Sequence, residues 1–245
     1  MQSKSERVVL VVQARVGSSR LPRKMLRDLC GKPILQRVLE RVRCSKLAQC
    51  FVLAVPDTED NASLSAFASD YGFEFFQGSE DDVLDRFYQA VSCQLDVSQS
   101  GAAVIRVCAD NPFIDPVEVD RLVRTFFRGT YDYAFNHRPV MGSNYVDGLG
   151  AEIFSFSVLE RICRATTEPS EREHVTKYVF EHTAEFAIGV VEAPVGLAFP
   201  EIKLDIDTDR DLQRARSVYE SLLNTGGERL FSGSEIVAHA RMLEL

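Results

Sequence analysis

The amino-acid sequence predicts an α/β fold, a three-layer sandwich in which helices cover both faces of a mostly parallel, mixed sheet. Short continuous apolar runs, of which residues 8–12 are the first, are typical of strands buried on both faces. Amphipathic segments with helical spacing separate these runs. Strands and helices that alternate with short links form parallel sheets with right-handed crossovers. At 245 residues, the chain is long enough to bury such a core in one main domain.

The first half of the chain alternates regularly. Gly31, Lys32 and Pro33 punctuate it, and apolar residues then recur at helical spacing from Ile34 to Val42. We expect strands at residues 8–12, 51–55, 73–76 and 103–107, and helices at residues 34–42, 60–71, 87–91 and 118–127. Sheets of this kind bind ligands at the carboxyl ends of their strands. The segments that follow these strands are therefore the place to look for a site.

The second half is less regular. We expect strands at residues 131–135, 151–156, 186–191 and 202–206, and helices at residues 157–164, 172–181 and 209–223. The loop of residues 136–150, rich in Gly, Asn and Pro, is a further candidate to line a site. Residues 1–225 form the expected main domain, and residues 226–245 form a helical tail packed on the same domain.

Charge and hydropathy argue against several classes of protein. A net charge of -8 and a pI near 5.1 disfavour a nucleic-acid-binding surface but are compatible with a local basic site for a small anion. The sequence lacks an apolar stretch of about 20 residues, so we expect no membrane segment, and its first residues do not have the pattern of a signal peptide. The six cysteines include no C-x-x-C pair, which favours reduced thiols in a cytoplasmic protein over zinc or disulfides.

The strongest local signal is the segment of residues 13–24, which directly follows the first expected strand. Small residues would let backbone N–H groups approach a phosphate chain, and basic side chains would hold its charge. These residues are Gly17, Ser18 and Ser19, and Arg15, Arg20, Arg23 and Lys24. The segment is neither a P-loop nor a G-x-G-x-x-G fingerprint. A solvated basic loop with a turn at Leu21 and Pro22 is the alternative interpretation.

Two aspartates follow expected strands elsewhere in the chain. Asp110 comes after residues 103–107, and Asp207 comes after residues 202–206, where Asp205 and Asp207 also form a D-x-D string. From the residues alone, a turn or cap residue before Asn111 and Pro112 is the favoured explanation of Asp110. Asp207 has a similar ordinary explanation, because Asp or Thr at residues 207–208 would make an N-cap for the next helix.

Residues 9–35 resemble the amino-terminal signature of the cytidylyltransferase family that includes the CMP-KDO and CMP-acylneuraminate synthetases. That signature reads A-R-x-x-S-x-R-L-P-x-K followed by G-K-P, and the matching residues here are Ala14, Arg15, Ser18, Arg20, Leu21, Pro22, Lys24, Gly31, Lys32 and Pro33. The likeness is closest to the SpsF branch of spore coat polysaccharide biosynthesis and recurs at residues 78–86, 109–115, 169–176 and 207–208. Lys203 departs from that branch, which tends to have an aromatic residue there.

The resemblance implies a GT-A-like nucleotide-diphospho-sugar transferase fold and an enzyme that transfers CMP from CTP to a sugar or sugar-acid acceptor with release of pyrophosphate. It implies catalytic roles for Arg15, Lys24, Asp110 and Asp207, with Mg²⁺ on Asp110 and Asp207. The implied nucleotide-binding residues are Gln13, Ala14, Arg15, Gly17, Ser18, Arg20, Lys24, Ser79, Arg86 and Asp110. The implied acceptor-binding residues are Asn136, His137, Arg138, Glu152, Glu171 and His174. A homodimer is the implied assembly.

Three alternatives stay open at this point. A nucleotidyltransferase for a sugar 1-phosphate would use another base, and a glycosyltransferase would use the D-x-D string, although that string normally follows a mid-chain strand. A nucleotide sensor would keep the fold without turnover. Two segments also have ordinary structural explanations: residues 79–86 as an acidic helix start, and residues 171–174 as an exposed helical face.

Overall fold

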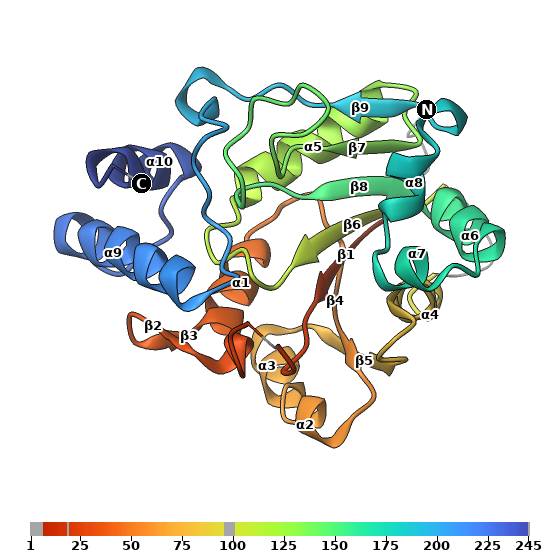
Figure 1. The fold of residues 1–245 in the computed structure, drawn as a ribbon, viewed down its shortest axis with the longest axis horizontal. Helices are drawn as coiled ribbons and strands as arrows, with labels where there is room; N and C mark the ends of the chain where they lie inside the picture. Colours follow the sequence, from red (N-terminus) through yellow and green to blue (C-terminus); the bar gives the residue numbers. More distant parts are fainter. Residues whose placement is uncertain (1–6, 19, 96–100, 245) are drawn as a thin grey trace.

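A computed structural model describes residues 7–18, 20–95 and 101–244, and its central element is a seven-stranded sheet in the order β5-β4-β1-β6-β8-β7-β9 (Figure 1). The strands are β1 (Val8–Gln13), β4 (Cys50–Pro56), β5 (Glu74–Gly78), β6 (Ala103–Cys108), β7 (Tyr133–Phe135), β8 (Glu152–Ser155) and β9 (Ile188–Val190). β1 pairs in parallel with β4 and β6, and only β8 runs antiparallel to its two neighbours, β6 and β7. The predicted mostly parallel, mixed sheet is confirmed.

Helices cover both faces of this sheet, and a short hairpin of β2 (Asp28–Leu29) and β3 (Lys32–Pro33) follows β1. The helices are α1 (Ile34–Val42), α2 (Glu59–Ala62), α3 (Ser65–Tyr71), α4 (Val83–Ser92), α5 (Pro116–Arg128), α6 (Phe156–Ala165), α7 (Pro169–Glu173), α8 (Lys177–Glu181), α9 (Asp209–Gly226) and α10 (Gly233–Met242), with 3-10 turns η1 (Lys24–Leu26), η2 (Thr183–Glu185) and η3 (Val195–Leu197). Among the helices of the described ranges, none combines the length and the apolar character needed to cross a membrane.

Two hydrophobic cores explain why the central strands β1 and β4 are almost entirely apolar. Successive side chains of a strand point to opposite faces. Leu10 of β1 therefore belongs to the core that includes residues of α1, α3, α5, α9 and α10, whereas Val11 belongs to the core that includes residues of α4, α6 and α8. Each fully buried Val, Leu or Phe contributes roughly 1.5–3 kcal/mol by leaving water. A strand that faces two cores therefore has no place for an alternating polar residue.

Two of the expected helices are each broken in two. Residues 60–71 form α2 and α3, because the buried Asn61 turns its amide to the backbone N–H of Val16 (2.8 Å) and to the hydroxyl of Thr58 (2.7 Å). Residues 172–181 also fail to form one helix, because α7 ends at Glu173 and α8 begins at Lys177. Thr176, between the two helices, is buried and donates a hydrogen bond to Glu152 (2.8 Å). In both places a tertiary contact overrides the helical periodicity.

The expected strand at residues 202–206 is wrong. This segment makes one isolated bridge, between Lys203 and Asp147, and its backbone bonds the loop of residues 136–150 and the carbonyl of Asp110 (Ile206 N to O, 2.9 Å). Ile202, Leu204 and Ile206 are buried as they would be in a strand. Their alternation indicated extended chain correctly, but the partner is a loop and not the sheet.

The last helices pack on the first core. Thr208 is the N-cap of α9, and its hydroxyl and the carboxylate of Asp211 form a capping box. α10 buries Ile236 against the same core as β1, and its first residue, Gly233, donates its backbone N–H to Asp115 Oδ2 (2.6 Å). A Cβ at Gly233 would lie 2.7 Å from that oxygen, so a glycine is needed for this close approach.

Candidate active site

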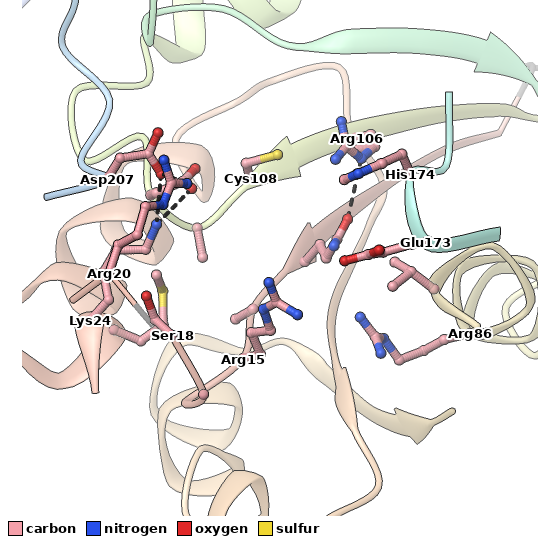
Figure 2. Close-up of a pocket in the computed structure, with 17 residues that line it drawn as sticks. Arg15, Ser18, Arg20, Lys24, Arg86, Arg106, Cys108, Glu173, His174 and Asp207 are labelled. Carbon is pink, nitrogen blue, oxygen red and sulfur yellow. Dashed lines mark hydrogen bonds and ion pairs between the residues drawn. The ribbon is translucent and has the colours of Figure 1, made fainter. Parts of the chain in front are cut away.

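A cavity opens at the carboxyl ends of β1 and β6, where α/β sheets bind their ligands. It is lined by Gln13, Ala14, Arg15, Gly17, Ser18, Arg20, Lys24, Met25, Val83, Arg86, Arg106, Cys108, Ala109, Asp110, Glu173, His174 and Asp207. Figure 2 shows Arg20, Lys24 and Asp207 at one end of this cavity and Arg86, Glu173 and His174 at the other, with Arg15 between them. We refer to it as the first cavity.

The loop after β1 presents its charged residues because its apolar residues are anchored. Val16 and Leu21 are buried in the first core, whereas Arg15 and Arg20 are exposed. Arg23 adopts a left-handed conformation (φ 54°) that turns the chain into η1. Ser19, one of the predicted small residues, lies outside the described residues. A Cβ at Gly17 would contact nothing within 4 Å, so no steric contact in the structure requires a glycine at this position.

The structure brings Asp110 and Asp207 together on one ammonium group. Lys24 Nζ lies 3.0 Å from Asp110 Oδ2, 3.5 Å from Asp207 Oδ1 and 2.9 Å from the carbonyl oxygen of Ile206. Arg20 Nη2 also contacts Asp207 Oδ1, at 2.8 Å. Asp207 is therefore not the N-cap of α9, a position that Thr208 takes, and the Asp110 carboxylate does more than close a turn.

These two carboxylates have the chemistry of a metal site that is completed by a substrate. Within the described ranges, no group of three or more His, Cys, Asp or Glu side chains is arranged to hold a metal ion. Mg²⁺ in proteins is commonly held by one or two carboxylates together with phosphate oxygens and waters. Asp110 and Asp207 already share a single cation, Lys24, so the pair fits this mode of binding.

Arg86 forms the opposite wall. Its side chain is buried, it donates to the carbonyl of Ser79, and its Nε has no hydrogen-bond partner among the described residues. Burial lowers the pKa of this guanidinium to about 10, and the nearby charge of Arg15 acts in the same direction. Among the described residues, neither arginine forms an ion pair with a carboxylate, although the charges of Glu80 and Asp82 act on Arg86. Two like charges that face one cavity in this way favour an anionic ligand between them. Ser79 itself directly follows β5, where its hydroxyl accepts the backbone N–H of Asp82, and it is not among the residues that line this cavity.

A second cavity adjoins the first and shares Arg106 and His174 with it. Its lining is Arg106, His137, Arg138, Glu152, His174, Thr176, Lys177 and Phe180. Four of the six expected acceptor residues are in this list. The other two, Asn136 and Glu171, are not among the described residues that line either cavity: Asn136 bonds Glu118 and Ala151, and Glu171 bonds the hydroxyl of Thr166.

Arg106 was missed by the sequence interpretation although a signal was present. It is the one charged residue in the apolar strand β6, and such a residue inside a buried strand needs a partner. Its partner is Glu152 of β8, which also accepts hydrogen bonds from Tyr133 (2.5 Å) and Thr176 (2.8 Å). Arg106 Nε donates in addition to Gln13 of β1 (3.3 Å).

The pKa values of this network follow from burial and from the ion pair. Burial by itself would raise the pKa of Glu152, but the Arg106 guanidinium and the two hydroxyl donors outweigh it and hold the pKa at about 2. Burial lowers the pKa of His137 to about 4 despite the nearby Glu152 carboxylate. At neutral pH Glu152 is therefore charged and neutralised by Arg106, while His137 is uncharged.

The fold and the first cavity define a class: an α/β protein that places converging cations and a pair of carboxylates at the carboxyl edge of its sheet, as an enzyme of nucleotidyl transfer needs. Residues 9–233 match the model of the family described as cytidylyltransferase. The chain belongs to the cytidylyltransferase family, and the resemblance seen in its sequence is confirmed.

Similar proteins agree with this assignment. The chain is 32% identical to the spore coat polysaccharide biosynthesis protein SpsF of Bacillus subtilis over 94% of its own length and 92% of that protein. It is 32% identical to the 3-deoxy-manno-octulosonate cytidylyltransferase of Brucella ovis over 52% of its length and 49% of that enzyme. The structure of a cytidylyltransferase from Leptospira borgpetersenii superposes with a TM-score of 0.83 at 26% identity, covering 97% of this chain and 94% of that one.

Proposed function

We propose that this protein transfers CMP from CTP to a sugar or sugar-acid acceptor, with release of pyrophosphate, in the biosynthesis of a surface polysaccharide. The observation that supports this most is the first cavity, where Arg15, Arg20, Lys24 and Arg86 converge on an otherwise acidic protein. The names of two relatives, SpsF and the Brucella ovis enzyme, point to polysaccharide biosynthesis and to an acidic sugar as acceptor. We further assign the fold to the GT-A-like class of nucleotide-sugar enzymes.

The nucleotide half of the site is the loop after β1 together with the start of α4. Gln13, Ala14, Gly17 and Ser18 line the cavity and would place backbone and hydroxyl groups along the triphosphate. Arg15 and Arg86 approach it from opposite walls. Nucleotidyl transfer depends mostly on positioning and on cations that neutralise developing charge, and these side chains supply both.

Asp110 and Asp207 would hold a divalent cation, which we propose is Mg²⁺. Such an ion supplies neutralisation of charge on the reacting phosphate and on the departing pyrophosphate. In the structure Lys24 occupies the space between the two carboxylates. We propose that this ammonium turns toward the phosphates when the nucleotide binds, and that Arg20 follows because it also contacts Asp207.

The acceptor half is the second cavity. Arg138, Lys177 and His174 offer donors to hydroxyl and carboxylate groups, and the ion-paired Arg106 and Glu152 complete the polar lining. Arg106 and His174 line both cavities. An acceptor oxygen in the second cavity would therefore lie next to the phosphate chain in the first, which is the arrangement that an in-line attack needs.

Pyrophosphate release tests this proposal. CTP, UTP, GTP and ATP are each offered with and without Mg²⁺ or Mn²⁺, together with a panel of sugar acids and sugar 1-phosphates. We expect release that depends on CTP, on a divalent cation and on a sugar acid.

Variants of the two aspartates test the assigned roles. Asp110→Asn and Asp207→Asn should lose turnover, whereas Asp209→Asn, which removes a carboxylate that is 68% exposed and paired with Arg27, should not. Nucleotide binding without release on any acceptor would indicate a sensor instead, and release with another base would refute the choice of CTP.

A further inference from the structure

Arg172 is placed next to the site but points away from it. The two residues that follow, Glu173 and His174, line the first cavity, and His174 lines the second as well. α7, which contains Arg172, has only five residues, and its N-cap residue, Glu168, makes no side-chain capping hydrogen bond. Helices this short are not stable by themselves in water. The placement of His174 therefore depends on whatever holds α7 in position.

The side chain of Arg172 ties α7 to two neighbouring helices. Its Nε and Nη2 lie 2.9 and 2.5 Å from Asp82 Oδ2, and its Nη1 donates to the carbonyl oxygen of Cys163 near the end of α6 (2.8 Å). The Arg172 side chain is only 17% exposed. Figure 1 shows α4, α6 and α7 as neighbours on one side of the sheet. Charge-assisted bonds with this partial burial are stronger than those of a surface pair.

Asp82 uses its two oxygens for two different tasks. Oδ1 accepts the backbone N–H of Asp85 (2.9 Å) and so caps α4, while Oδ2 holds Arg172. One turn later α4 carries Arg86, and Val83 of the same helix lines the first cavity too. The Asp82 carboxylate thus connects the start of α4, which presents Arg86, with α7, which presents His174.

We propose that Arg172 is a positioning residue. Through its ion pair with Asp82 it fixes the position of His174 relative to Arg86, and so keeps the second cavity aligned with the first. The effect on turnover rests on the proposed function, but the effect on His174 does not. Arg172 touches neither cavity and is not among the residues that would contact nucleotide or acceptor.

Kinetics provide the first test. Arg172→Met should lower kcat/KM for the acceptor by about 10- to 100-fold, since displacements of about 1 Å in a site can cost 10²-fold. CTP affinity should change far less, because Asp82 still caps α4. Asp82→Asn keeps a capping oxygen and should match Arg172→Met, and the double variant should be no worse than either single one. Arg172→Lys, which keeps the charge but loses the two-pronged contact, should recover part of the loss.

The matched control is Arg161→Met. Arg161 is a surface residue of α6 that pairs with Glu185 and lines neither cavity. This variant should retain wild-type kcat/KM. An additive double variant, or equal losses in Arg172→Met and Arg161→Met, would overturn the proposal.

Nuclear magnetic resonance of the histidine rings gives a test that needs no turnover. The chain has four histidines, so the ring signal of His174 can be assigned with His174→Gln. Arg172→Met should shift this signal in the free protein and leave that of His239, on α10, unchanged, and Arg161→Met should shift neither. An unmoved His174 signal in Arg172→Met overturns the proposal even if the enzyme is active. A shifted signal without pyrophosphate release supports it and counts against the proposed function alone.

Discussion

Replacement of Glu152 by Gln tests the buried ion pair that Glu152 of the second cavity makes with Arg106, which lines both cavities. Glu152 is 2% exposed and neutralises Arg106, so the variant leaves a guanidinium inside the protein without its counter-charge. Breaking one side of a buried pair costs about 3–5 kcal/mol. Independently, a pKa lowered from 4.5 to about 2 corresponds to about 3 kcal/mol of native-state stability at neutral pH. Together these estimates predict a fall of roughly 6–20 °C in Tm for a chain of this size.

The lowered pKa of Glu152 also predicts how the stability difference between wild type and Glu152→Gln changes with pH. The native pKa of Glu152 lies below its unfolded value, so its contribution is complete above about pH 4.5 and is lost as the pH falls toward 2. The difference between wild type and Glu152→Gln should therefore narrow across that window. Urea unfolding from pH 7 to pH 3 measures it. A Tm within 2 °C of wild type at pH 7, or a difference that does not narrow, would refute the reasoning. Glu160→Gln, on the surface of α6, serves as the control with an expected change under about 0.5 kcal/mol.

Three further predictions concern a glycine, a lysine and a histidine. Gly150→Ala should lower the stability to urea by about 1–3 kcal/mol, because a Cβ would lie 2.0 Å from the carbonyl oxygen of Asn136; Gly101→Ala, where a Cβ meets nothing, should not. Lys24→Met should tighten the binding of Mn²⁺ in the absence of nucleotide by about tenfold, because the competing ammonium group is gone. Titration followed by electron paramagnetic resonance measures this affinity, and a lower affinity in the variant would contradict the prediction. His137 has a pKa of about 4 in the native protein and 6.5 when unfolded, so its contribution to stability is complete above pH 6.5 and is lost as the pH falls toward 4. His137→Gln should therefore make the urea midpoint depend less on pH between pH 4 and 6.5. An unchanged pH dependence would contradict the assignment.

Local patterns predicted most of the secondary structure because they report burial directly. The apolar runs of β1, β4 and β6 face two cores, and the helical spacing of α1 and α5 follows one buried face. The same patterns failed at residues 202–206. There the alternation of Ile202, Leu204 and Ile206 correctly indicated burial, but alternation cannot say whether the partner is a strand or a loop.

The residues of the candidate site also divide into those that a local pattern could predict and those that it could not. The basic loop after β1 was visible because its charges are exceptional in an acidic chain. Asn136 and Glu171 looked like equally good polar candidates, yet both bond the protein itself. A polar residue type does not reveal whether its hydrogen-bonding groups are already used inside the fold.

The sequence by itself determined the α/β class, the family and the segment that carries the basic loop, because periodicity and local motifs are properties of neighbouring residues. Only the tertiary structure decided that Asp110 and Asp207 meet on Lys24, that Arg106, which lines both cavities, pairs with Glu152, and that Arg172 faces Asp82 and not the site. These pairs join residues that are far apart in the chain. Their geometry depends on how helices and loops pack across the edge of the sheet, and no local pattern contains that information.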